Sequence, residues 1–228
     1  MKLKKYTLNF FLIVIICLFY SCKEDRTSEN SLTEGTIEYK TTVINENSPM
    51  AGFAPGSARV NFKNNNLHVE MSVMGVLNTS FISKPQDHTL AQMVKFFDIK
   101  SACIQKEEEL TAENKEYEIK LEETKETKVI AGYKCKRVIA SMLNNPSNIF
   151  DIYYTTDLGK DSINHIGPYK GIKGMLMQYR LKKLGLELCF TATSVRKIEV
   201  KDELFEIPSY YKIVTRPEMD KLFADFQK

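Results

Sequence analysis

Along most of the chain, apolar and polar residues alternate with the period of two that is typical of half-buried β-strands. In residues 36–44, for example, Ile37 and Tyr39 alternate with Glu38 and Lys40. The same pattern predicts further strands in residues 59–62, 67–74, 79–83, 117–121, 134–142, 150–155, 175–180 and 186–193.

Short turn segments join several of these predicted strands. Residues 63–66 are rich in asparagine, which tolerates the positive φ of tight turns, and they predict a β-hairpin between 59–62 and 67–74. The strands at 175–180 and 186–193 form a second predicted hairpin.

Two segments in the middle of the chain depart from this alternation. Leu90 and Met93 belong to an apolar stripe with helical spacing, so a helical turn is predicted in 87–95, before a strand that continues through Ile104. Residues 107–115 are mostly charged and are expected to be solvated.

The C-terminus changes to a helical period. Thr215 and Glu218 form a capping box with Pro217 just inside the predicted helix. One apolar stripe follows, made of Met219, Leu222, Phe223 and Phe226. Because the opposite face is mixed rather than basic, we expect the helix to pack on the sheet and not on a membrane.

These elements predict a mainly β (α+β) fold: a strongly curved antiparallel sheet or incomplete barrel. The apolar concave face must be covered, and the C-terminal amphipathic helix and a short helical plug at 87–95 are the candidates. If that face leaves room for an apolar ligand, the candidate lining residues are Val69, Met71, Val73, Leu186, Leu188 and Phe190.

The N-terminus has the pattern of a secretory signal. Three lysines at positions 2, 4 and 5 precede the apolar run 10–20, which is shorter than the ~20 residues that a membrane-spanning helix needs. One interpretation is an ordinary signal peptide cut near Ser21. The other starts from residues 18–21 followed by Cys22, which resemble a bacterial lipobox. That resemblance implies that Cys22 carries a covalent diacylglycerol and an N-acyl chain, which anchor the protein to a membrane.

This reading divides the chain into a lipoprotein signal peptide (1–21), a flexible tether (22–34) and a single domain (35–228). The tether is rich in Ser, Glu, Asn and Thr. Its start, residues 23–25, resembles the signal that sends some Bacteroidetes lipoproteins to the cell surface. We expect a location in the bacterial cell envelope, anchored to the outer membrane and facing either the periplasm or the cell surface.

Charge argues against a nucleic-acid partner. The chain has 32 basic and 29 acidic residues, a formal net charge of +3. The three N-terminal lysines account for that excess, and no basic run is interleaved with aromatic residues.

The cysteines leave two alternatives open. Apart from Cys17 and Cys22 the chain has Cys103, Cys135 and Cys189, so at most one disulfide can form among these three. The alternative, which we favour, is that they pack as small buried apolar residues. Their spacing fits no metal motif.

The sequence contains no constellation typical of an enzyme. H-E-x-x-H, C-x-x-C and G-x-S-x-G are all missing. Asp157 and Asp161 could pair as acid and base, but turn geometry explains aspartates in a glycine-rich loop equally well. We expect no catalytic residues, no metal and no cofactor beyond the acyl chains on Cys22.

Three segments carry a resemblance to envelope lipoproteins of Bacteroidetes. Residues 130–138 (IAGYKCKRV), 153–179 and 204–211 (LFEIPSYY) look like motifs of a group that includes the GLPGLI family. In 171–176 Lys173 replaces the proline of the GLPGLI string, which indicates a neighbouring branch, a domain of unknown function. The resemblance implies a fold like that of the lipoprotein carriers LolA and LolB, an incomplete antiparallel barrel around helices, and it implies no catalytic residues.

Two functions remain open at this point. The protein is either a lipid-anchored module that binds a lipid or other apolar ligand in its concave face, or a structural lipoprotein with a solid core that contacts another envelope protein. The expected partners are therefore the membrane, an apolar ligand and an envelope protein.

Overall fold

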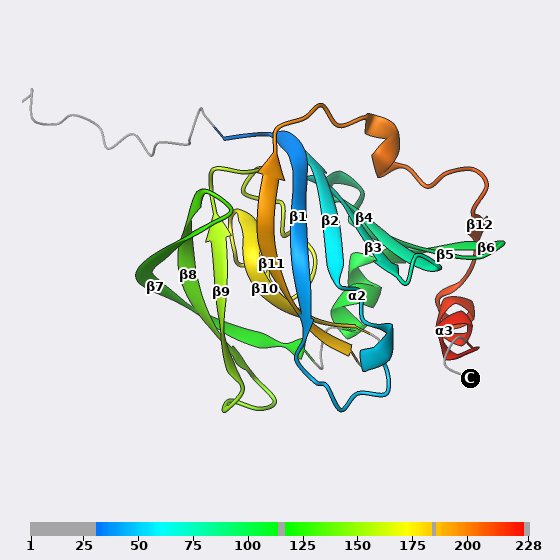
Figure 1. Cartoon of the computed structure of the whole chain (residues 1–228), viewed down its shortest axis with the longest axis horizontal. Coiled ribbons are helices and arrows are strands. Elements are labelled where there is room, and N and C mark those ends of the chain that lie inside the picture. The colour runs from blue at the N-terminus through cyan, green and yellow to red at the C-terminus, as the bar shows by residue number, and fades with distance from the viewer. Residues whose placement is uncertain (1–30, 114–116, 184–185, 226–228) are drawn as a thin grey trace, which may run out of the picture.

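The computed structural model describes residues 31–113, 117–183 and 186–225 (Figure 1). The strands are β1 (Glu34–Val43), β2 (Ser57–Lys63), β3 (Asn66–Val73), β4 (Leu77–Lys84), β5 (Thr89–Phe96), β6 (Ile99–Lys106), β7 (Ile119–Ile130), β8 (Tyr133–Met142), β9 (Ile149–Thr155), β10 (Met175–Lys183), β11 (Leu186–Arg196) and β12 (Lys212–Ile213). The α-helices of the described residues are α2 (Glu107–Glu113) and α3 (Arg216–Asp225), and short 3-10 turns occupy Ala51–Phe53, Pro85–Asp87 and Asp202–Phe205.

All twelve strands belong to one sheet, in the order β12-β6-β5-β4-β3-β2-β1-β11-β10-β9-β8-β7. Neighbours pair antiparallel throughout, except for the short parallel pair β12–β6. The sheet is open, with β12 and β7 at its edges. The prediction of a mainly β fold built on an antiparallel sheet is confirmed.

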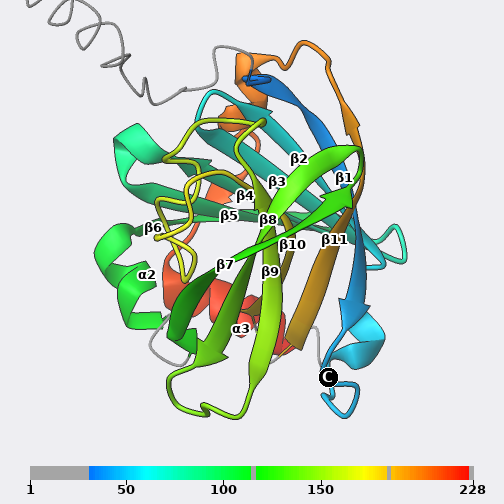
Figure 2. The same cartoon turned by 90° about the vertical axis from the view of Figure 1, so that its left-hand side faces the viewer.

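The sheet bends around one concave face. Paired residues of adjacent strands share a face, so Val94, Thr79, Met71, Ala58 and Tyr39 form one row from β5 to β1. Helix α3 packs against this face at Val94. Figure 2 shows the bend from the side, with strands β7–β9 in front of β3–β6.

Most predicted turns are present. Asn64 adopts a positive φ of 56° in the β2–β3 hairpin, and β10 and β11 form the second predicted hairpin. Between β7 and β8, Ala131 and Gly132 both have positive φ, 49° and 86°, and such a pair matches the twist of a two-residue hairpin. Gly132 thus supplies a backbone angle that residues with a Cβ resist.

The helical plug predicted for residues 87–95 is wrong. Apart from the 3-10 turn that ends at Asp87 and its capping residue His88, the segment is strand β5. Its central residues 91–94 are all buried, because α3 covers one face of the strand and the segment 200–211 covers the other. A strand that is buried on both faces does not alternate between apolar and polar residues. The apolar residues of β5 therefore had a spacing that also fits one face of a helix, and the segment was assigned as helical.

Residues 107–115 are not simply a solvated segment. Helix α2 begins at Glu107, and its Leu110 is buried. Three glutamates in the first turn stabilise the helix, because their negative charges interact favourably with the positive end of the helix dipole.

The C-terminal helix α3 begins directly after Thr215. The backbone N–H and the hydroxyl of Thr215 both donate to Glu218 Oε2, at 2.7 and 2.8 Å. Met219 and Phe223 are buried against Val94 and Cys103 of the sheet. Phe226, the last residue of the predicted stripe, lies outside the described residues.

The end of the predicted tether belongs to the folded part. Leu32 forms a parallel bridge with Leu158, and β1 begins at Glu34. The predicted signal peptide, Cys22 and the start of the tether lie outside the described residues.

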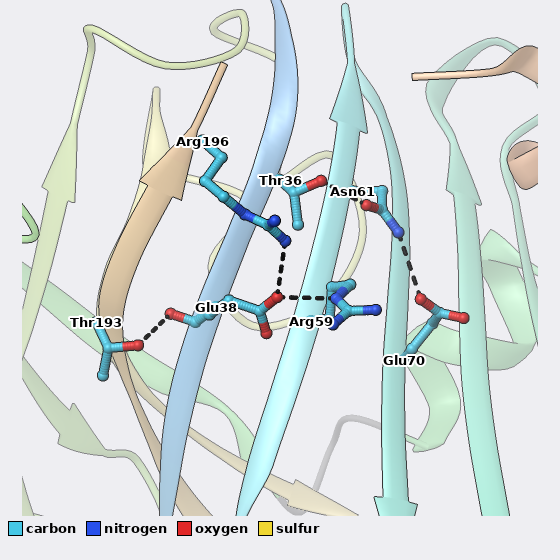
Figure 3. A network of polar contacts seen from close by, with 7 residues as sticks. All are labelled: Thr36, Glu38, Arg59, Asn61, Glu70, Thr193 and Arg196. Carbon is cyan, nitrogen blue, oxygen red and sulfur yellow. Dashed lines mark hydrogen bonds and ion pairs between the residues drawn. The ribbon is translucent and has the colours of Figure 1, made fainter. Parts of the chain in front are cut away.

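Polar contacts join four strands on the outer face of the sheet (Figure 3). Glu38 of β1 accepts from Arg59 Nε at 2.8 Å and from Arg196 Nη2 at 3.3 Å. Asn61 of β2 donates to Glu70 Oε2 of β3 at 3.4 Å. Exposed ion pairs contribute at most about 1 kcal/mol each. These contacts therefore link neighbouring strands but add little to the stability of the fold.

Gly174, directly before β10, is required by its surroundings. Its φ is +141°, and a Cβ there would lie 2.5 Å from the carbonyl oxygen of Thr155. We expect Gly174→Ala to lower the free energy of unfolding by about 1–3 kcal/mol, measured by urea denaturation. Gly56→Ala is the matched control, since no atom lies within 4 Å of that Cβ position; equal losses in both variants would refute this role.

Candidate ligand-binding cavity

Aromatic rings gather on the concave face of β1, β10 and β11. Tyr179 stacks on Phe190 with ring centroids 5.0 Å apart, and Tyr39 and Tyr169 meet Tyr179 edge to face. The Tyr39 hydroxyl donates to the Leu176 carbonyl at 2.7 Å. Burial, with Tyr179 nearby, raises the pKa of Tyr39 well above its ordinary value. Its phenol therefore stays protonated at neutral pH.

Beside these rings lies an apolar cavity of about 110 Å³. Its walls come from β3–β5 on one side, from β10 and β11 on the other, and from α3 and the β1–β2 connection. The lining residues are Met50, Phe53, Pro55, Met71, Val73, Leu77, Thr79, Phe81, Gln92, Leu181, Leu186, Leu188, Phe190 and Phe223. All are apolar except Thr79 and Gln92. The curvature of the sheet creates this cavity, because β3–β5 and β10–β11 are separated in the sheet by β1 and β2.

Five of the six candidate lining residues lie in the cavity wall: Met71, Val73, Leu186, Leu188 and Phe190. Val69 does not. It lies on the same face, paired with Phe81, but it packs against the main core. Leu188 and Phe190 also belong to that core, so one wall of the cavity is the surface of the packed interior.

The sequence reasoning missed several wall residues. Met50 and Phe53 lie in the β1–β2 connection, for which no element was predicted, and Phe223 was assigned to helix packing alone. Leu77 and Phe81 lie on the cavity face of β4, because they pair with Val73 and Val69 of β3. The predicted strand 79–83 began two residues too late to include Leu77. Gln92 was hidden by the incorrect helical assignment.

A polar cluster lies where α3 meets the cavity wall. Arg216, the first residue of α3, donates from Nη1 to Gln105 Oε1 at 2.9 Å and to Gln92 Oε1 at 3.4 Å. Arg216 also pairs with Asp220, at 3.0 Å from Nε. Both glutamines are buried. The cluster therefore joins the N-terminus of α3 to β5 and β6 beside an otherwise apolar space.

The cysteines have no disulfide in the described part of the chain. Cys103 and Cys135 are buried and Cys189 is half-buried. Burial raises the pKa of Cys135 to about 11, so its thiol stays protonated at neutral pH. Two of the three thus behave as the small buried residues that we favoured. Within the described residues, no group of three or more His, Cys, Asp or Glu side chains is placed to hold a metal ion.

Comparisons with known proteins find similar folds but give no information about the chemistry of this chain. No protein-family model matches the chain, and no curated protein matches it. Among solved structures, two crystal forms of PNGF-II, in space groups C2 and P21, are similar with TM-scores of 0.51 and 0.52 at 16% and 15% identity. The alignments cover 85% and 83% of this chain but only 32% and 33% of PNGF-II. The chain thus spans about a third of that protein, and at this identity the likeness shows a shared fold alone.

Among the described helices, none has the length and the apolar character needed to cross a lipid bilayer.

Proposed function

We propose that this chain is a lipoprotein of the bacterial cell envelope, anchored to the outer membrane through Cys22, that binds a lipid or other apolar ligand in its concave face. The cavity carries the proposal, because twelve of its fourteen lining residues are apolar and ligand pockets are mostly apolar with few polar groups. The role is binding, not catalysis. The fold is taken as an incomplete barrel of the LolA/LolB kind, in a branch near the GLPGLI family of Bacteroidetes.

The size of the cavity limits what it encloses. Pockets that surround drug-sized ligands measure roughly 300–1,000 Å³, whereas this cavity measures about 110 Å³. An apolar cavity of about 150 Å³ is sufficient to bind benzene. The proposal is therefore that one short apolar group, such as part of an alkyl chain, enters the cavity.

The same observation favours a second candidate, a structural lipoprotein with an essentially solid core. In that case the cavity is a packing defect, and the outer face contacts another envelope protein. The uptake of an apolar ligand, which only the first candidate requires, distinguishes the two.

Native mass spectrometry separates the two candidates. The full chain carrying Cys22→Ala is purified without detergent, its mass is recorded, and bound molecules are extracted into organic solvent. The ligand-binding proposal predicts one co-purifying alkyl compound per chain, or its uptake when phospholipid or fatty acid is added. A clean apo mass under both conditions would leave the solid-core candidate.

A further inference from the structure

Large apolar side chains are exposed at one end of the sheet, next to the cavity. Because neighbouring strands run antiparallel there, the β1–β2 connection and the β3–β4 and β5–β6 turns lie at the same end. The wall of the cavity reaches the surface at this end, since Phe53 of the β1–β2 connection lines the cavity and is 43% exposed. In the two turns, Met74 is 84% exposed and Phe97 69%, and Ile99 beside Phe97 is 42% exposed.

Strand pairing connects these residues to the cavity wall. Val73 and Leu77 both line the cavity and pair with each other across the β3–β4 turn. Leu77 also pairs with Phe96, which in turn pairs with Ile99. Paired residues share a face, so all four belong to the concave face. The ring of Phe97 lies against that of Phe96, with centroids 4.7 Å apart. An apolar strip therefore leads from the wall to the exposed end of β6, made of Leu77, Phe96, Phe97 and Ile99.

The turns themselves do not require large apolar residues. Met74 and Phe97 have φ angles of 51° and 49°, in the left-handed region that glycine and asparagine adopt most readily. Neither residue is buried, so packing within the fold does not offset this unfavourable backbone angle. Strained residues of this kind cluster at ligand sites, and contiguous exposed apolar surface marks a binding surface.

The cavity holds only a small part of a lipid chain. An apolar cavity of about 150 Å³ binds benzene, so one of about 110 Å³ takes roughly six carbons or fewer. The acyl chain of a membrane lipid spans half of a hydrocarbon core of about 30 Å. Most of such a chain must therefore lie outside the cavity, and contact with apolar protein surface would remove it from water.

We propose that the ligand is a long-chain lipid, whose chain end fills the cavity while the rest of the chain lies along the apolar strip. This inference rests on the proposed function and adds the class of the ligand and a second contact surface. Met74 directly follows the wall residue Val73, so it adjoins the point where the strip meets the wall.

The test compares radiolabelled octanoic and palmitic acids, which carry the same carboxylate on a short and a long chain. Binding to the full chain carrying Cys22→Ala is measured by equilibrium dialysis without detergent. The double variant Met74→Asn with Phe97→Asn removes both exposed side chains, and asparagine tolerates the positive φ of these positions. Val129→Asn is the matched control, because Val129 is also 69% exposed but lies on β7, away from the cavity wall.

The double variant is expected to bind palmitic acid about tenfold more weakly than the protein without these substitutions, which corresponds to ~1.4 kcal/mol. Its affinity for octanoic acid should not change, because the cavity is intact. Val129→Asn should bind both acids normally. Ile99→Thr, which keeps a β-branched side chain in the strand, should show a smaller loss for palmitic acid alone, and it decides the question if the double variant does not fold.

Three results would overturn the inference. If both acids bind but the variants change both affinities alike or change neither, the strip does not hold the chain, while ligand binding stands. If the double variant binds palmitic acid normally but sediments less with phosphatidylcholine vesicles, the exposed residues contact a membrane instead. If the protein without these substitutions binds neither acid, the proposed function fails as well.

Discussion

Replacing Cys22 by alanine is expected to move nearly all of the protein from the membrane fraction to the soluble fraction. Each buried CH₂ of an acyl chain contributes about 0.8 kcal/mol, and two or more chains anchor a protein stably, whereas one chain binds only marginally. Cell fractionation followed by immunoblotting measures the change, and labelling with a radioactive fatty acid should disappear with it.

Cys17→Ala is the matched control, because it makes the same substitution five positions earlier, inside the apolar run. It should leave both the membrane fraction and the acyl label unchanged. Retention of Cys22→Ala in the membrane would contradict the lipoprotein assignment.

Filling the cavity is expected to abolish ligand binding while the protein stays folded. Val73 lies at the end of β3 and is half-buried in the cavity wall. Val73→Phe places a ring where an alkyl group would lie, so the affinity for octane should fall at least tenfold. Overpacking a filled core costs about 1–3 kcal/mol; because Val73 adjoins empty space, its variant should lose less, as measured by urea denaturation.

Val129→Phe provides the matched control. Val129 is 69% exposed on β7 and does not line the cavity, so its variant should bind octane like the wild type. Equal affinities in the Val73 and Val129 variants would place the ligand elsewhere. A large loss of stability in Val73→Phe alone would indicate a tightly packed core and would favour the solid-core candidate.

The alternation of residues predicted most of the sheet because most strands have one buried and one accessible face. In β11, Leu186, Leu188 and Phe190 are buried while the residues between them are half-exposed, and this segment was recognised. Strand β5 is buried on both faces, so its sequence carried no such signal. Helix α2 is too charged to show an apolar stripe, and a single buried position such as Leu110 establishes no period.

Cavity residues could be predicted from the sequence where they lie on the apolar face of a single strand. They could not be predicted where their position depends on how separate elements pack together. Met71 and Val73 follow from the face of β3. By contrast, Phe223 reaches the cavity because α3 crosses the sheet, and Phe53 because the β1–β2 connection folds back. Gln92 lies in the wall and contacts Arg216, which is more than a hundred residues away, and the periodicity of the sequence gives no sign of such a pairing.

The central claim is that an apolar ligand occupies the concave cavity, and photo-crosslinking tests it most directly. The full chain is incubated with a decanoic acid that carries a photoreactive diazirine at its far end, irradiated and digested, and the modified residues are mapped by mass spectrometry. We expect adducts on cavity residues such as Met71, Leu188 and Phe223, and excess decanoic acid should suppress them. Adducts confined to the outer face of the sheet, or adducts that excess decanoic acid does not reduce, would contradict the claim.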